Sequence, residues 1–523
     1  MPAPPTSLHD KAAQLVFARI GSNMPPPVTV REDAARMEAL LERCPLGGLI
    51  LFNGEVPETP EVLARLQAKT PYPLLVATDM ERGVGQQIRG ATVFPHAMAY
   101  AAMGDDAEAA VEASARIAAR EALACGIHLT FSPVADVNRD RRNPIIATRA
   151  YSDDPDAVAR LATAYIRGCH AEGLLTTAKH FPGHGGTSQD SHEEMPVVPD
   201  DRAVLERTDL HPFRRVIEAG VDVIMTAHIS VPALDPSGTP ATLSAPILKP
   251  LLRDDLGFSG AVFTDSLLMG AIRAEPGAFG KQAAALVQAG VDVVLDTPEP
   301  EEAVAGLVQA VENGSLDEAR LDEACRRVWV LKQKLLDRFG PTIFTAPHEH
   351  IAWDEVGTAA HHARAEDIAR RAVSVHDPSG QLPLQPTDTR SLMVLLVKPH
   401  RSRLDPPEAP LAAAVREAYP GAMYQEVGPE MDEAALRDLL VQAQSMQHIV
   451  VAMIVKPAAW HRFGLQPAQQ QLVESLVAQQ SVVLASLGSP YILDAFPENS
   501  PRLCTYSDVA VSQRALVAVL ADG

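Results

Sequence analysis

Eight short apolar segments alternate with helical patterns over the first 340 residues, and this alternation constrains the fold more than any other feature. Each segment is bounded by glycine or polar residues and is rich in Leu and β-branched residues. This is typical of strands that are buried on both faces of a parallel sheet. Between them lie segments with the composition of amphipathic helices, such as Ala107–Cys125 and Asp156–Glu172. The eight apolar segments are Leu15–Ile20, Gly48–Phe52, Leu74–Asp79, Leu129–Val134, Leu174–His180, Val221–His228, Ala261–Asp265 and Val291–Asp296.

Eight β/α repeats in this length of chain predict an α/β fold in which a (β/α)8 TIM-type barrel closes on itself. An open, doubly wound sheet is the alternative that the pattern leaves. The composition changes after a long charged helical pattern at Leu321–Phe339. A linker follows, then a helix at Thr358–Arg371, and then a smaller α/β region with strands at Ser391–Val397, His448–Ile454 and Ser481–Leu487. We predict a catalytic barrel at residues 1–340, a linker and connecting helix at 341–370, and a C-terminal α/β domain at 371–523.

The net charge of the chain disfavours two classes of partner. A formal charge of −21 disfavours binding to nucleic acid, which requires a basic face on the protein, and binding to an anionic membrane surface.

The five cysteines are scattered, odd in number and never in a Cys-x-x-Cys pair, so we predict buried free thiols rather than disulfides or a zinc site. The N-terminus has no secretory pattern, and no apolar run reaches the ~18 residues of a membrane helix. We therefore expect a cytoplasmic protein.

In a parallel barrel the active site lies at the C-terminal ends of the strands, so polar residues that end apolar segments are the candidates. These are Asp79, the Asp136–Arg149 loop, Lys179, His180, His228, Asp265 and Asp296. Any one of them could instead cap a helix or anchor a loop. The specific alternative for Asp265 is an N-cap of the following helix. A carboxylate at this place could also attack an anomeric carbon to form a glycosyl-enzyme.

The segment Ala178–His192 is the richest in chemistry. It starts at a strand end and continues into a loop whose glycines permit unusual backbone conformations and suggest mobility. Asp190 and His192 are two residues apart, so in an extended loop their side chains share a face. A carboxylate beside an imidazole fixes its tautomer and raises its pKa, as a general acid/base requires. Two alternatives are a pair that only anchors the loop, and a metal site made from His180, His184, Asp190 and His192. We predict no metal, because these histidines lie on a Gly/Pro loop without the preset geometry of a helix.

These residues together resemble glycoside hydrolase family 3, and most of all its β-N-acetylglucosaminidase branch. The Lys-His-Phe-Pro-Gly-His-Gly-x4-Asp-Ser-His string at 179–192 matches that branch in full. Phe-Thr-Asp-Ser-Leu-Leu-Met at 263–269 is similar to the nucleophile motif, with Ser266 in place of a second Asp. The loop that begins at Asp79 resembles the substrate-binding Asp-x-Glu-x-Gly loop, and 134–155 resembles the next loop of the family. The resemblance covers about Asp10 to Phe339, and the C-terminal region is similar to the family's α/β sandwich.

The resemblance implies a set of site residues. Asp265 is the nucleophile, and His192 is the acid/base with Asp190 orienting it. The residues that bind hydroxyls of the terminal sugar are Asp79, Arg89, Arg149, Lys179 and His180. The spacing after Asp79 departs from the commonest form, so either Arg82 or Arg89 reaches the sugar. Residues 145–149 lack the usual glycine before the arginine.

The function that follows from the resemblance is retaining hydrolysis that removes terminal non-reducing β-linked N-acetylglucosamine, with no cofactor. The partner is a small oligosaccharide or a muropeptide, with peptidoglycan recycling as the context. A neutral imidazole does not repel an anionic nucleophile, so phosphate could replace water and give a phosphorylase. A β-glucosidase on the same fold is a further alternative. A non-catalytic sugar-binding barrel and a metal-dependent hydrolase are alternatives from other classes.

Overall fold

The computed structural model describes residues 3–187, 195–272, 274–401, 409–457 and 463–522. The chain forms two compact units that interleave along the sequence. The first unit consists of Met1–Thr92, Glu108–Asp140 and Ser152–His362, and the second of Val93–Ala107, Arg141–Tyr151 and Ala363–Gly523. Two segments from the barrel region therefore group with the C-terminal unit, which a linear division of the chain does not anticipate. The boundaries at 340 and 370 stay a prediction.

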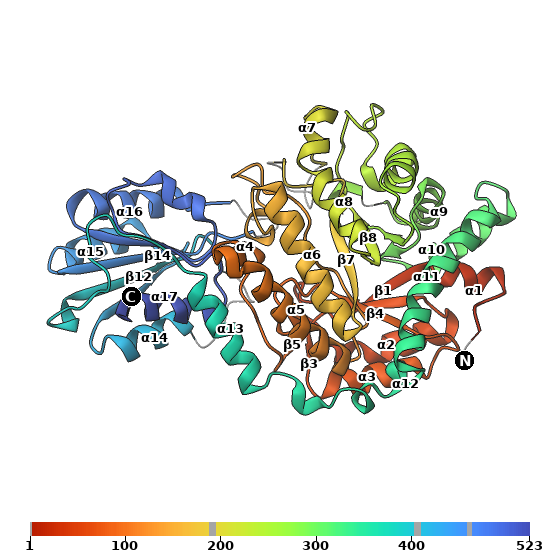
Figure 1. The fold of residues 1–523 in the computed structure, drawn as a ribbon, viewed down its shortest axis with the longest axis horizontal. Helices are drawn as coiled ribbons and strands as arrows, with labels where there is room; N and C mark the ends of the chain where they lie inside the picture. Colours follow the sequence, from red (N-terminus) through yellow and green to blue (C-terminus); the bar gives the residue numbers. More distant parts are fainter. Residues whose placement is uncertain (1–2, 188–194, 273, 402–408, 458–462, 523) are drawn as a thin grey trace. The chain divides into compact units, whose positions relative to one another are not determined.

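The first unit is built on eight parallel strands in the order β10-β1-β2-β4-β6-β7-β8-β9. Figure 1 labels β1, β4, β7 and β8 of this sheet. A parallel bridge between Phe263 and Val293 joins the two ends of this order. The sheet therefore closes, which confirms the predicted (β/α)8 barrel and excludes the open sheet. The strands are β1 Val16–Ile20, β2 Gly48–Leu51, β4 Leu75–Thr78, β6 Leu129–Thr130, β7 Leu175–Phe181, β8 Val223–Thr226, β9 Ala261–Phe263 and β10 Val294–Leu295. A small separate ladder pairs β3 Gly54–Glu55 with β5 Ile88–Arg89.

Helices follow the strands, and their ends are set by local sequence. Thr29 and Glu32 form a capping box at the start of α2, and α6 runs from Pro155 behind an Asp154 N-cap to a left-handed Gly173. The helices of this part of the chain are α1 Leu8–Ala13, α2 Val30–Arg43, α3 Glu58–Gln67, α4 Ala97–Ala101, α5 Ala107–Ala124, α6 Pro155–Glu172, α7 Arg202–Arg207, α8 Leu210–Glu218, a π-helical segment Ile247–Asp255, α9 Phe279–Ala289, α10 Pro300–Glu312, α11 Glu318–Phe339, α12 Thr342–Thr345 and α13 Ala359–Arg371. No helix in the described part of the chain is long and apolar enough to cross a membrane.

The inside of the barrel is a packed core and not a channel. The rings of Phe17 and Phe263 meet edge to face at 5.2 Å, and the ring of Phe131 lies 6.3 Å from that of Phe263. Gly48 makes room for this core, because a Cβ at that position would lie 2.4 Å from the Phe17 ring. With its interior filled, the barrel offers ligands only the loops at its ends.

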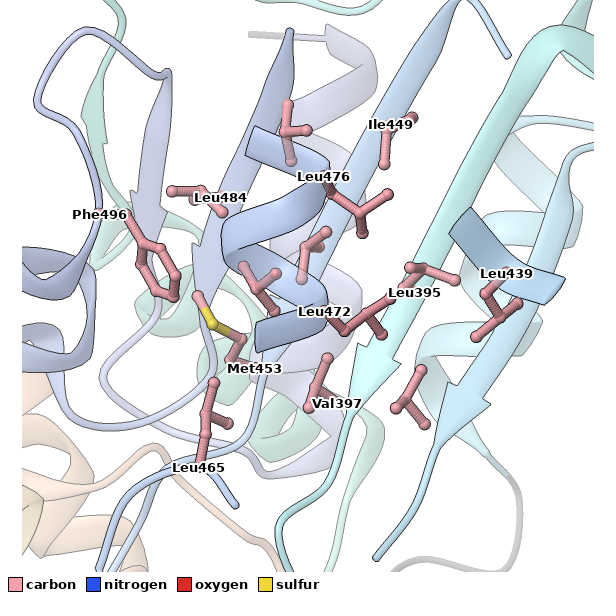
Figure 2. Close-up of a cluster of buried hydrophobic side chains, with 14 of the residues drawn as sticks. Leu395, Val397, Leu439, Ile449, Met453, Leu465, Leu472, Leu476, Leu484 and Phe496 are labelled. Carbon is pink, nitrogen blue, oxygen red and sulfur yellow. The ribbon is translucent and has the colours of Figure 1, made fainter. Parts of the chain in front are cut away.

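The second unit contains a six-stranded sheet in the order β11-β16-β15-β14-β12-β13, parallel except for the edge strand β11. Successive residues of β12 enter two separate cores, because Leu395 faces one side of the sheet while Val394 faces the other. Figure 2 shows the first core, where Leu439 of α15 and Leu472 of α16 pack on the same face as Leu395. Helices α14 and α17 cover the other face. The elements are β11 Ser374–His376, β12 Leu392–Val397, α14 Pro410–Ala418, β13 Met423–Val427, α15 Glu433–Ala443, β14 His448–Met453, α16 Pro467–Gln479, β15 Val482–Ser486, β16 Arg502–Cys504 and α17 Ala510–Asp522.

Candidate active site

The barrel brings several of the predicted site residues to one rim. Asp79 directly follows β4, Lys179 and His180 lie near the end of β7, and Asp265 follows β9 by two residues. Because all the strands are parallel, these positions share the C-terminal end of the barrel.

Lys179 is held between two carboxylates. Its Nζ lies 2.7 Å from Asp79 Oδ1 and 2.8 Å from Glu81 Oε1. The lysine side chain is only 3% exposed, whereas that of Asp79 is 29% exposed. A buried ammonium requires such partners, and Asp79 keeps part of its carboxylate toward solvent. The arrangement therefore offers a sugar both a fixed cation and an open hydrogen-bond acceptor.

His180 is fixed by Asp136, a fully buried carboxylate. His180 Nδ1 lies 2.6 Å from Asp136 Oδ2, and the same oxygen accepts the His180 backbone N–H at 3.1 Å. The other oxygen accepts the His184 backbone N–H at 2.7 Å. Burial raises the pKa of Asp136, but the neighbouring His180 and His184 outweigh it and hold the pKa below its usual value. An ionised Asp136 fixes the proton of His180 on Nδ1.

Asp265 is part-buried and accepts the Ser266 backbone N–H at 2.7 Å. Burial raises its pKa, but His180, His228, this N–H and Lys179 together lower it below the usual value. Among the described residues, no α-helix starts at Asp265, because a turn and a three-residue 3₁₀ helix follow. The interpretation of Asp265 as an N-cap is therefore wrong. An ionised carboxylate at this place suits a nucleophile.

Ser266, at the place of the family's second Asp, belongs to a network behind the nucleophile. Its Oγ donates to Asp296 Oδ2 at 2.6 Å, and Asp296 is paired with Arg19. His228 lies on the same side, because its Nε2 is 3.1 Å from the Ser266 carbonyl oxygen and its Nδ1 is 2.8 Å from Thr242 Oγ1. The serine thus links the segment after β9 to the residue after β10.

The glycines of the 183–186 loop have packing reasons. A Cβ on Gly185 would lie 1.7 Å from the Val137 carbonyl oxygen, and one on Gly183 would lie 2.5 Å from Asp209. Gly183 also has φ +126°, which other residues avoid. Close packing therefore accounts for these glycines, whereas their sequence alone suggests mobility.

The other predicted residues have different surroundings. Arg89 is exposed and pairs with Glu55 at 2.5 Å across the β3–β5 ladder. Arg149 lies in segment 141–151, which groups with the second unit, and its Nη1 donates to the Ile145 carbonyl at 3.1 Å. Asp190 and His192 lie outside the described residues. Within the described residues, no group of three or more His, Cys, Asp and Glu side chains could hold a metal ion.

Sequence reasoning missed the roles of several residues that the geometry adds to the site. Asp136 belongs to a predicted candidate loop without an assigned role, and Glu81 belongs only to the motif after Asp79. Their signal is present in the sequence, because an acidic residue that follows a buried strand in a barrel requires a partner. Arg19 at the end of β1 has no signal beyond its charge.

Comparison with known proteins identifies the family of this chain. The model of the glycosyl hydrolase family 3 N-terminal domain matches residues 7–331. The chain belongs to glycoside hydrolase family 3. Among family relatives, a β-hexosaminidase A of Pseudoalteromonas piscicida is 30% identical over 90% of this chain and 84% of its own length. A β-hexosaminidase of Xanthomonas euvesicatoria pv. vesicatoria is 37% identical over 55% of this chain and 87% of its own. A family 3 β-N-acetylglucosaminidase structure from Paenibacillus sp. str. FPU-7 is 32% identical, with a TM-score of 0.85 over 99% of this chain and 97% of that chain.

Proposed function

We propose that this family 3 glycoside hydrolase removes terminal non-reducing β-linked N-acetylglucosamine with retention, through a covalent intermediate on Asp265. The observation that supports this most is the position of Asp265, whose pKa lies below its usual value, on the same barrel rim as the Lys179–His180 pair. Its relatives named β-hexosaminidase and β-N-acetylglucosaminidase support the choice of sugar.

The described rim residues would bind the terminal sugar. Asp79 accepts a hydroxyl hydrogen on its open side, while the Lys179 ammonium donates to a hydroxyl oxygen. With Nδ1 held by Asp136, His180 meets the sugar through Nε2. We retain Arg149 as a further hydroxyl ligand. Arg89 is the weaker choice of the two arginines after Asp79, because Glu55 engages it at the surface.

Two displacements at the anomeric carbon make up the reaction. Asp265 attacks this carbon while His192 gives its proton to the departing glycosidic oxygen, and Asp190 stabilises the imidazolium. His192 then takes a proton from water, and the resulting oxygen nucleophile releases the sugar from Asp265. A sugar hemiacetal with the original configuration results, and both catalytic groups return to their starting protonation states.

The choice of substrate is tested with aryl glycosides. The complete string at 179–185 favours aryl β-N-acetylglucosaminide over aryl β-glucoside. We expect a higher kcat/KM for the former. An equal or higher kcat/KM for the β-glucoside contradicts the proposal and favours the β-glucosidase alternative.

Phosphorolysis is a second candidate, because His192 would be uncharged when the second displacement begins, whereas a carboxylic acid that has given its proton would be an anion and would repel phosphate. Aryl release in the presence and absence of phosphate, with the sugar product identified as free sugar or sugar 1-phosphate, separates the two reactions. Muropeptide donors and a cytoplasmic location stay predictions.

The acid/base role of His192 is tested with leaving groups of different pKa. An activated aryl group needs little protonation to depart, whereas a sugar alcohol needs much. His192→Ala should therefore slow natural disaccharides far more than dinitrophenyl glycosides, and Asp190→Ala should do the same more weakly. His376→Ala, an exposed histidine on β11, is the matched control. A slope of log(kcat/KM) against leaving-group pKa that equals the wild-type slope refutes the assignment, and pre-steady-state aryl release excludes a limiting loop closure.

A further inference from the structure

A pocket lies at the end of the barrel opposite the rim. Its wall includes residues that precede β8 and β9, such as Val221 and Gly260, so it opens at the N-terminal ends of the strands. The other wall is one face of α11, which contributes Arg326, Arg327, Val330, Leu331 and Lys334. The pocket has a volume of about 490 Å³. This is within the range of about 300–1,000 Å³ that small-molecule sites occupy.

The charged residues around this pocket carry more positive than negative charge, although the chain as a whole carries −21. Lys334 pairs with Asp222 at 2.6 Å, but Asp222 also binds His170. The single carboxylate of Asp292 forms ion pairs with three guanidinium groups, at N–O distances of 2.7 to 3.1 Å. With His170 counted as neutral, the Lys and Arg side chains at the pocket and in its ion-pair network outnumber the carboxylates: Arg253, Arg320, Arg326, Arg327 and Lys334 against Asp222, Asp292 and Glu323.

Burial, and to a smaller degree the neighbouring arginines, affects the charged groups of the cluster. Burial together with the charges of Arg327 and Arg320 outweighs Asp292 and lowers the pKa of Arg253 to about 10. The Nε–H of Arg327 is buried and has no hydrogen-bond partner within the described structure. Arg326, exposed on the same face of α11, stands at the pocket wall. A buried donor without a partner costs free energy, and the exposed Arg326 guanidinium beside it is the group that an oxyanion in the pocket can reach directly.

The rest of the wall is apolar. Val330 is 42% exposed, which is unusual for a large aliphatic residue in this chain, and it lines the pocket with Phe258 and Leu331. The other side of the wall includes Gly257 and Ser259, which add little bulk. An occupant that satisfies both parts of the wall therefore has an anionic group and an apolar group.

We propose that this pocket binds a small organic oxyanion, a phosphate or carboxylate on an apolar group, at the end of the barrel away from the sugar site. Guanidinium groups match both oxyanions in planar, bidentate geometry. The oxyanion lies against Arg326 and Arg327, and the apolar group against Val330 and Phe258. This inference does not depend on which glycoside the rim cleaves.

Calorimetric titration of the whole chain with phenyl phosphate, benzoate and uncharged benzyl alcohol tests the proposal. The titration is run with and without excess N-acetylglucosamine, and binding at this pocket should be the same in both. We expect an anionic probe to bind and benzyl alcohol to bind much more weakly. The comparison of phenyl phosphate with benzoate identifies which oxyanion is preferred.

Two variants on the exposed face of α11 test where the probe binds, and neither of them removes a buried side chain. Arg326→Gln should weaken the anionic probe by about tenfold or more, because a charge-assisted hydrogen bond is lost. Val330→Trp should fill the pocket and abolish binding with all charges intact. Lys281→Gln, an exposed lysine of α9 outside the pocket, removes the same charge and should leave the affinity unchanged. The proposal is overturned if neither anion binds up to about 10 mM, if benzyl alcohol binds equally, or if Arg326→Gln has wild-type affinity.

Discussion

The two ends of the barrel bury charged side chains with opposite balance. At the N-terminal end, guanidinium groups outnumber the carboxylates that pair with them. Among the residues of the Lys179, Asp136 and Ser266 contact networks at the rim, carboxylates outnumber Lys and Arg side chains: Asp79, Glu81, Asp136, Asp265 and Asp296 against Lys179 and Arg19. The same fold thus presents an acidic end and a basic end.

This difference suits different chemistry. Glycoside cleavage passes through an oxocarbenium-like transition state, and surplus carboxylate stabilises positive charge as it develops on the sugar. At the basic end the buried Asp292 carboxylate has its hydrogen-bonding capacity filled by protein donors. It accepts hydrogen bonds from Arg253, Arg320, Arg327 and the Val262 backbone N–H. Charge pairs of this kind at the bottom of a barrel contribute to stability rather than to catalysis.

The largest expected effect is at the acidic end. Asp265→Asn keeps the shape of the side chain but removes the nucleophile, so kcat on an aryl β-N-acetylglucosaminide should fall by several orders of magnitude. The fold should survive, because the asparagine oxygen can still accept the Ser266 backbone N–H. Asp254→Asn, on the surface, is the control for loss of a carboxylate. Near-normal turnover by Asp265→Asn would remove it from the mechanism.

At the basic end the expected effect is on stability. Asp292→Asn leaves three arginines without their carboxylate, and the free energy of unfolding should fall by about 3–5 kcal/mol. The folded fraction should keep its kcat and KM. Denaturant unfolding with Asp255→Asn as control measures this, because the exposed Asp255–Arg202 pair contributes at most about 1 kcal/mol. A loss no greater than that of the control would show that the cluster does not stabilise the barrel.

The strand pattern of the barrel could be predicted because each strand is buried on both faces. The same physics makes β12, β14 and β15 visible in the sequence, while β11, β13 and β16 are missing from the prediction. β13 has four half-buried residues and contains Gln425 and Glu426, so it lacks a continuous apolar run, and β16 has only three residues. The edge strands β11 and β13 do not need apolar residues on both faces, because they are less buried. Their hydrophobic pattern in the sequence is therefore weaker.

The site residues divide in the same way. Asp79, Lys179 and Asp265 could be placed on one rim because barrel topology brings strand ends together whatever the loops do. The contacts of Asp136 depend on how two loops fold over each other, and those of Arg89 on a two-residue ladder. Neither arrangement leaves a periodic pattern, so the sequence alone could not assign these partners.

A smaller effect is expected when the support of His180 is changed. In Asp136→Asn one acceptor oxygen becomes an NH2 group, which must face either the His180 or the His184 backbone N–H. If the NH2 group takes the place of Oδ2, it also donates to His180 Nδ1 and favours the tautomer with its proton on Nε2. The sugar-facing nitrogen then changes from acceptor to donor, and kcat/KM should fall by about 10–100-fold. Nitrogen-15 spectra of the histidine rings report the tautomer directly. If the tautomer is unchanged while activity falls, Asp136 acts through packing and not through His180.

The smallest expected effect concerns a buried lysine at the basic end of the barrel. Lys332 on α11 is fully buried, and its ammonium has the Gln14 amide oxygen as a partner. Burial lowers the pKa of Lys332 from 10.5 to about 7. Between pH 7 and pH 10.5 the unfolded chain binds more protons than the folded chain. The free energy of unfolding therefore rises with pH over this range. Below pH 7 the full cost of burying the charge is present, and above 10.5 it is absent.

Lys332→Met should therefore stabilise the protein most below pH 7, where it removes a buried charge and loses only the Gln14 hydrogen bond. The gain should shrink as pH rises from 7 to 10.5, because the wild-type lysine is then neutral when folded. Denaturant unfolding of both proteins at about pH 6, 8 and 10 measures the difference, and Lys281→Met, at an exposed position of α9, is the control. A gain that is constant with pH would mean that packing, and not the buried charge, separates the two side chains. Loss of stability at every pH would mean that the Gln14 contact outweighs the cost of burial.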